Sequence, residues 1–191
     1  RVYGLDFDST GRWLASSGKD RLVKVWNVET GTLKTSLAGH EENVTGVKFL
    51  PDGKRLISVS NDHSVRMWSL DGRRTGRVLG SHDSRVTHLD VNSSGAFVAA
   101  ATNKGDVRIW DVESGTLASV LPKRNNEAIY DVAFSPDGRF LATAGRDHRV
   151  RLWSVDGEVA ESHHPPHKGG VSAVRFNPDG TKVATVGADR T

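Results

Sequence analysis

Cysteine is absent from the 191-residue sequence, and no apolar run reaches the length of a membrane-spanning helix. The first absence excludes disulfide bridges, thiolate metal sites and a cysteine nucleophile. Charge of one sign is also scarce, because 26 Lys and Arg stand against 23 Asp and Glu, a net charge of +3 spread along the chain. Nucleic-acid-binding proteins typically carry a concentrated basic patch, so this composition argues against that class. We expect a cytoplasmic protein with no membrane partner.

The sequence also lacks the motifs of common catalytic centres. It contains no phosphate-binding glycine loop, no Gly-x-Ser-x-Gly nucleophile turn and no His-Glu-x-x-His zinc motif. One cluster, His163-His164-Pro165-Pro166-His167, has a metal-binding composition. No carboxylate or cysteine completes a spaced ligand set there, and the two prolines are typical of a stiff surface connection. We therefore predict a protein that is not an enzyme and that uses no metal or cofactor.

What the sequence does contain is a repeat. Trp26, Trp68, Trp110 and Trp153 each end a short alternating segment, and they lie 42, 42 and 43 residues apart. A tight-turn tripeptide recurs with the same period, as Ser-Thr-Gly11, Pro-Asp-Gly53, Ser-Ser-Gly95, Pro-Asp-Gly138 and Pro-Asp-Gly180. Such tripeptides join antiparallel strands, because proline presets φ and glycine accepts a positive φ. A period of this length, built of strand-like pieces, indicates the blade of a propeller.

Each repeat contains up to four strand-like segments. The first has the pattern Val-x-x-Val-x-Phe, the second consists of small residues, and the third ends at the tryptophan. The fourth is more polar and is expected at 33–37, 75–79, 117–121 and 158–162. We predict an all-β fold in which residues 1–191 form one propeller segment of four-stranded antiparallel blades. The expected blades are 1–39, 40–81, 82–124 and 125–166, followed by the first hairpin of a fifth blade at 167–191.

These residues resemble the WD-repeat β-propeller family, whose repeat pairs a Gly-His dipeptide with a Trp-Asp dipeptide. Gly39-His40 stands at the first position, Trp110-Asp111 is the literal second dipeptide, and the match covers essentially the whole chain. In that family a His, a Ser or Thr, an Asp and the Trp of one repeat form a buried hydrogen-bonded chain. The resemblance implies this chain for His40, Ser58, Asp62 and Trp68. Any of these groups buried alone would cost about 1–3 kcal/mol.

The other repeats keep only part of this set. The third has Ala100 and Lys104 where Ser and Asp are expected, and the fourth has Asn125 in place of histidine. We expect these blades to depend more on apolar packing, and we interpret the family-pattern residues as structural. The partial sets are Ser16, Asp20 and Trp26; His82 and Trp110; Thr143, Asp147 and Trp153; and His167, Thr185 and Asp189.

The expected array is incomplete. It starts with a first strand and stops after a second, so the two end blades do not complement each other. Uncovered apolar faces and strand edges promote association. We expect the ring to be completed by further blades or by another chain.

The resemblance also implies a partner-binding surface. It is formed by the loops that enter the first strand of each blade and by the turns that join the second strand to the third. The residues placed there are Arg1, Asn43, Arg85, Ala128 and Gly170 before first strands, and Lys19, Asn61, Asn103, Arg146 and Ala188 after second strands. Arginine pairs with carboxylate or phosphate in a two-pronged geometry. We therefore predict a locally basic face and a protein or peptide partner that is acidic or phosphorylated.

The function predicted from the sequence is a non-catalytic scaffold or recognition module for protein–protein interaction. The alternative is a regulatory sensor array appended to a signalling ATPase or kinase whose catalytic part lies outside this chain. A phosphate-binding loop upstream of Arg1 would favour that alternative, and further blades would favour the scaffold. Nucleic-acid binding is a third interpretation, which predicts an affinity that falls steeply with salt.

Overall fold

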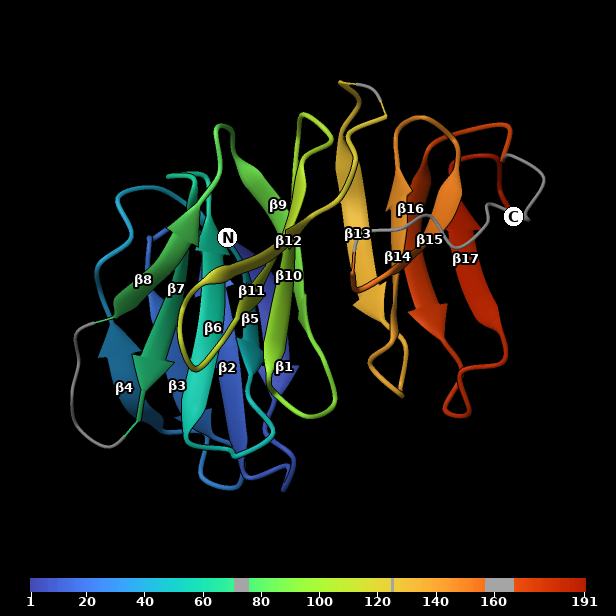
Figure 1. Ribbon diagram of the computed structural model, residues 1–191. Coiled ribbons are helices and arrows are strands. Elements are labelled where there is room, and N and C mark those ends of the chain that lie inside the picture. The colour runs from blue at the N-terminus through green and yellow to red at the C-terminus, as the bar shows by residue number, and fades with distance from the viewer. Residues whose placement is uncertain (71–75, 125, 157–166) are drawn as a thin grey trace. The chain divides into compact units, whose positions relative to one another are not determined.

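A computed structural model describes residues 1–70, 76–124, 126–156 and 167–191, and the regular elements in these ranges are all β-strands (Figure 1). Their bounds are β1 Val2–Phe7, β2 Trp13–Gly18, β3 Val23–Asn27, β4 Leu33–Leu37, β5 Val44–Phe49, β6 Arg55–Ser60, β7 Ser64–Ser69, β8 Arg77–Ser81, β9 Val86–Val91, β10 Phe97–Thr102, β11 Val107–Asp111, β12 Leu117–Val120, β13 Ile129–Phe134, β14 Phe140–Gly145, β15 Val150–Ser154, β16 Val171–Phe176 and β17 Val183–Gly187. Among the described residues, no helix is long and apolar enough to span a membrane.

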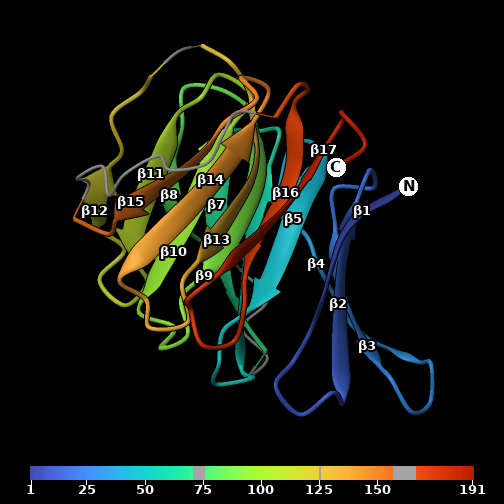
Figure 2. The same cartoon turned by 90° about the vertical axis from the view of Figure 1, so that its right-hand side faces the viewer.

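The strands pair antiparallel in chain order, so each sheet is a meander (Figure 1 and Figure 2). Strands β1–β4, β5–β8 and β9–β12 form four-stranded sheets, which are the first three blades. In the described part of the chain, the fourth blade contains β13–β15 and the fifth contains β16–β17. The all-β prediction of four-stranded blades followed by a partial one is confirmed. The fourth strand expected at 158–162 lies outside the described residues.

The chain divides into two compact units, Arg1–Val86 and Thr87–Thr191. The first unit holds the blades of β1–β4 and β5–β8. The second holds the blades of β10–β12, β13–β15 and β16–β17, together with most of β9. The organisation of residues 1–191 as one propeller segment stays a prediction.

The glycines of the five turn tripeptides close the hairpins between first and second strands. Their φ angles lie between 64° and 74°, a left-handed conformation in which glycine has no Cβ to clash. In each turn the glycine N–H donates to the carbonyl three residues earlier at 2.8–3.0 Å. These positive angles are found at Gly11, Gly53, Gly95, Gly138 and Gly180.

Two fourth strands differ from the sequence prediction: β12 ends at Val120, one residue early, and β8 differs at both ends. The fourth strand of the second blade was expected at 75–79, but β8 spans Arg77–Ser81 and pairs Ser64 with Ser81. The ring of Trp68 covers Gly76 so closely that a Cβ built there would lie 2.7 Å from it. The strand therefore begins after this glycine, where side chains have room.

The apolar cores lie between successive blades. In the first unit, Val23 and Val25 of β3 belong to one buried cluster with Val47 of β5 and Trp68 of β7. In the second unit, β11 contributes Ile109 to a cluster with β13, and β14 contributes Ala142 to another with β16. Each blade thus buries a face against its neighbour in the same unit, as expected for a repeat whose unit has too little core to stand alone.

The face of β1 has no such cover in this structure. Its apolar residues Val2, Leu5 and Phe7 are 59%, 61% and 57% exposed, whereas the equivalent Val44, Val47 and Phe49 of β5 are at most 7% exposed. The apolar face that is buried on β5 is therefore exposed on β1.

Carboxylates on the innermost strands add polar links between blades. In the first unit, the Phe49 N–H donates to Asp6 at 2.8 Å, and Lys48 Nζ lies 3.3 Å from the same carboxylate. In the second unit, the Phe134 N–H donates to Asp90 at 2.8 Å, and the Val174 N–H donates to Asp131 at 2.9 Å. These bonds satisfy backbone donors at the inner edge, which has no further strand to pair with.

Trp68 and Trp26 differ in burial, and this difference allows a test of the packing account. Trp68 is 1% exposed within the inter-blade cluster, whereas Trp26 is half-buried. Trp68→Ala should lower the free energy of unfolding by about 3–5 kcal/mol, because it removes a fully buried ring and leaves a cavity. The matched Trp26→Ala should cost clearly less. Denaturant unfolding of both variants measures the difference, and equal losses would contradict this assignment of the core.

Candidate functional site

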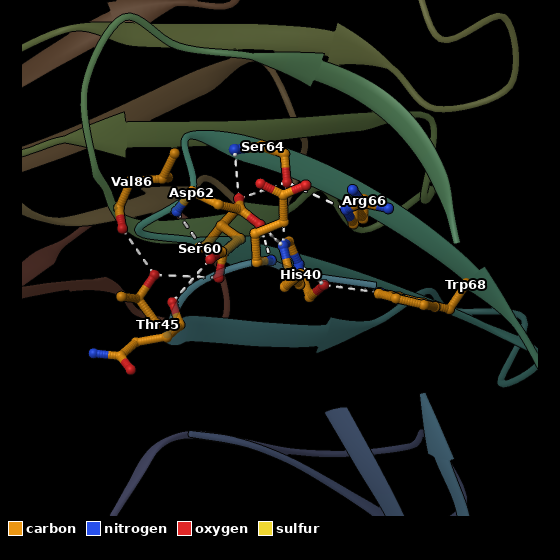
Figure 3. A network of polar contacts seen from close by, with 12 residues as sticks. His40, Thr45, Ser60, Asp62, Ser64, Arg66, Trp68 and Val86 are labelled. Carbon is orange, nitrogen blue, oxygen red and sulfur yellow. Dashed lines mark hydrogen bonds and ion pairs between the residues drawn. The ribbon is translucent and has the colours of Figure 1, made fainter. Parts of the chain in front are cut away.

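A chain of buried hydrogen bonds joins the loop before β5 to the turn after β6 (Figure 3). The indole N–H of Trp68 donates to Ser58 Oγ at 2.8 Å, and Ser58 Oγ lies 2.7 Å from His40 Nε2. On the other side of the ring, His40 Nδ1 lies 2.8 Å from Asp62 Oδ2. The four residues implied by the family resemblance are therefore in contact, and the chain runs from the core outward to the loops.

The directions of these bonds follow from the charges. Burial lowers the pKa of His40 below its ordinary 6.5, although Asp62 opposes the shift, so the ring is neutral at pH 7. A neutral ring donates from Nδ1 to the Asp62 carboxylate and accepts at Nε2 from the Ser58 hydroxyl. Burial opposes ionisation of Asp62 as well, but hydrogen bonds from Ser64 and from the Glu41 N–H outweigh it and lower its pKa from 3.8 to about 2.

Asp62 closes the turn from inside. Its carboxylate accepts the N–H of Glu41 at 2.9 Å, the N–H of Ser64 at 2.9 Å and the hydroxyl of Ser64 at 2.7 Å. One acid thus connects the entry loop of the blade with the turn between its second and third strands. The geometry of both loops depends on a group that is itself almost fully buried, with 8% of its side chain exposed.

The partial fifth blade repeats this arrangement. His167 Nε2 lies 2.9 Å from Thr185 Oγ1, and His167 Nδ1 lies 3.1 Å from Asp189. The Lys168 N–H donates to Asp189 at 2.7 Å. Hydrogen bonds from Thr191 and His167 hold the pKa of Asp189 well below its usual range.

In the first and fourth blades the acid of the turn pairs with a cation on the third strand. In the first blade Trp26 donates to Ser16 at 2.9 Å, and Asp20 forms an ion pair with Lys24. In the fourth blade Trp153 donates to Thr143 at 2.9 Å. There Asp147 pairs with Arg151 at 2.6 Å. The sequence analysis missed these ion pairs. A Lys or Arg stands two residues before each of the four repeat tryptophans, including Trp68 in the blade that contains His40, so this pattern does not single them out.

The third blade closes its turn differently. With Ala100 and Lys104 at the expected Ser and Asp positions, the Thr102 hydroxyl accepts the N–H groups of Lys104 and Asp106 at 3.3 Å and 3.1 Å. Asp106 in turn pairs with Arg108 at 3.0 Å. The acid of this turn is therefore Asp106, two residues after the expected position, and its cationic partner also lies on the third strand.

The network positions an exposed surface that we call the loop face. In each unit it comprises the residues entering the first strands and the turns after the second strands. Within a blade these two segments meet through one backbone hydrogen bond: Lys19 N–H to Arg1 O at 2.9 Å, Asn61 N–H to Asn43 O at 2.9 Å, Arg146 N–H to Ala128 O at 2.8 Å and Ala188 N–H to Gly170 O at 2.9 Å. The structure thus brings together four of the residue pairs predicted for this surface. Arg85 and Asn103 are both exposed, before β9 and after β10 respectively.

Basic side chains are exposed at loop-face positions in both units. Arg1, Lys19, Arg85 and Arg146 are all exposed. The Arg1 guanidinium lies over the ring of Tyr3, 5.3 Å from its centroid. Arg146, however, lies 3.4 Å from Glu127, and both side chains remain largely exposed. Such an exposed pair is weak and exchanges readily for another carboxylate.

Metal ligation finds no support among the described residues. Within these ranges, no group of three His, Asp or Glu side chains is arranged to hold an ion. His163 and His164 of the histidine cluster lie outside the described residues, and His167 contacts Asp189 and Thr185.

The neutral, buried His40 makes stability depend on pH. Its pKa in the folded protein is lower than in the unfolded chain, so the unfolded chain binds the proton first. The free energy of unfolding should therefore fall as pH drops below about 6.5, and Asp62 adds a second loss below about pH 4. We expect His40→Gln to be less stable at pH 7 and to show a flatter profile between pH 7 and 5. Denaturant titrations at each pH measure this, and parallel profiles for both proteins would refute it.

Comparison with known proteins identifies the same repeats. The family model described as "WD domain, G-beta repeat" matches residues 1–27, 31–69, 73–111, 115–154 and 160–191. Among curated proteins, Actin-interacting protein 1 of Drosophila melanogaster is 42% identical over 65 residues, which cover 33% of this chain and 11% of that protein. Transcriptional corepressor LEUNIG_HOMOLOG of Arabidopsis thaliana is 33% identical over 69 residues, covering 36% and 9%. Protein hir-1 of Neurospora crassa is 40% identical over 73 residues, covering 32% and 7%.

The matched part of this chain spans about a tenth of the length of each of these relatives or less. The family model, in contrast, matches along nearly the whole chain. Its five matches agree with the repeated tryptophans, the four-stranded meanders and the His–Ser–Asp–Trp chain. The chain belongs to the WD-repeat family.

Proposed function

We propose that this protein is a non-catalytic recognition module that binds protein partners through its loop face. The observation that carries the proposal is the construction of this face. In the second, fourth and fifth blades a buried acid holds the turn from inside, and in four blades one backbone hydrogen bond joins the turn to the entry loop of the same blade. Side chains on such a frame are presented in a preorganised geometry, which reduces the entropy lost on binding.

The chemistry of the face favours an acidic segment of a protein partner. Exposed arginine and lysine side chains lie at several turns, and Arg146 already forms an ion pair with the exposed carboxylate of Glu127. Arginine and tyrosine are enriched at binding hot spots, and Tyr3 and Tyr130 are 40% and 42% exposed beside this face. One of the relatives is named as an actin-interacting protein, which is consistent with this role.

Two arginines at opposite ends of β14 provide a matched test. Arg146 follows the strand on the loop face, and Arg139 precedes it in the hairpin turn at the other end. Their side chains are 70% and 78% exposed, and each pairs with one acid. A photo-crosslinking residue placed at 146 should capture one or a few discrete proteins in cells, whereas the same residue at 139 should not.

Charge reversal sharpens the same test. Arg146→Glu should abolish the capture seen from a second crosslinking position on the loop face of the same unit, the exposed Ala188, while Arg139→Glu should leave it unchanged. Both variants should keep the wild-type melting temperature within about 1–2 °C, since both positions are exposed. Equal capture from 139 and 146, or none from 146, would contradict the proposal.

A further inference from the structure

The third residue of the turn that follows each second strand adopts a left-handed conformation. Its φ angle is 66° at Arg21 and 74° at His63 in the first unit. In the second unit it is 78° at Gly105, 65° at His148 and 68° at Arg190. The third blade therefore uses glycine, while four other turns place a large basic residue at the same position.

This choice of residue has an energetic cost. A residue with a Cβ in the left-handed region is disfavoured by about 1–2 kcal/mol, whereas glycine is not. Gly105 shows that the fold accepts glycine at this position. Arginine and histidine are therefore not required by the turn geometry, and backbone strain of this kind is concentrated at functional positions.

In these turns the acidic side chain points into the blade, whereas the basic side chain that follows it is exposed. Asp147 and Asp189 point inward, where they contact Arg151 and His167 respectively. The residues that follow them, His148 and Arg190, are exposed. Because each inward carboxylate has its own cationic or imidazole partner inside the blade, it does not cancel the basic side chain beside it.

In the second unit two of these turns adjoin one surface. Gly170, at the entry to β16, lies between the fourth and fifth blades. A Cβ built on it would lie 3.4 Å from the Tyr130 ring and 3.6 Å from the Arg146 Cα. Its carbonyl accepts the N–H of Ala188, in the turn that carries Arg190. The entry to β16 therefore lies close to Tyr130 and Arg146, and the turn that carries Arg190 is hydrogen-bonded to it.

We propose that this surface, made of Tyr130, Arg146, His148, Lys168 and Arg190, binds an extended carboxylate-rich peptide segment of a protein partner, with the left-handed residues as its outer contacts. The inference rests on the proposed function and assigns it a ligand. The basic residues are distributed over two turns and an entry loop, a pattern that fits a row of single carboxylates better than one phosphate group. The exposed contact between Arg146 and Glu127 shows the same carboxylate chemistry within the chain.

Paired substitutions separate binding from stability. Arg190→Gly removes the cation and the strain, whereas Arg190→Lys keeps both. His148→Gly and His148→Arg form a second pair.

The probe is a fluorescein-labelled ten-residue peptide with glutamate at alternate positions, measured by anisotropy against the same peptide with glutamine. Arg190→Gly should weaken glutamate-peptide binding about 3- to 5-fold, the range of one exposed ion pair, and Arg190→Lys should retain it. His148→Arg should strengthen it, and both glycine variants should melt no lower than the wild type.

Several outcomes would overturn the proposal. Unchanged affinity in Arg190→Gly would show that the left-handed residue does not contact the peptide, and a lower melting temperature would show that the side chain is retained for stability. Equal binding of the glutamine peptide, preference for a phosphoserine peptide, or equal competition by single-stranded DNA would each overturn the assigned ligand. Loss of the ligand assignment with Arg146 crosslinking intact would leave the proposed function standing. Loss of that crosslinking would remove the proposed function itself.

Discussion

An inward-facing carboxylate in the turn after the second strand is the constraint on which the rest of the loop face depends. In the second blade, Asp62 binds His40 and two backbone N–H groups, and His40 continues the chain through Ser58 to the buried Trp68. Because every member would be costly to bury alone, the chain holds core, turn and entry loop in one arrangement. The first and fourth blades retain the acid with Lys24 or Arg151 as its partner, whereas the third blade has Lys104 at this position.

The same device explains how a small blade presents a defined surface. Apolar residues between successive blades of a unit supply the burial, and carboxylates such as Asp6 and Asp131 satisfy donors on the innermost strands. The loops can then carry residues that do not favour their own conformation, such as Arg190 at a φ of 68°. Stability is provided inside the blade, so the outer positions of the turn are available for recognition.

Much of the fold could be predicted from the sequence, because the repeat contains residues with strong local conformational preferences at fixed positions. The five turn glycines located the hairpins, and the spaced tryptophans located the third strands. The start of β8 was wrong because the Trp68 ring covers Gly76, a tertiary contact that no local pattern reports. The pairing of Asp147 with Arg151 was missed for a related reason: an ion pair between the turn and the third strand shows only once the strand register is known. The left-handed basic residues also required backbone angles.

Hydrogen exchange in an Asp62→Asn variant tests most directly whether the inward carboxylate holds the loop face. The amides of Glu41 and Ser64 donate to this carboxylate, whereas Ile57 lies in β6 and pairs with neighbouring strands. The account predicts faster exchange at Glu41 and Ser64 with little change at Ile57, because the loops would loosen before the sheet. Unchanged exchange at the two loop amides, or equal acceleration at all three sites, would contradict it.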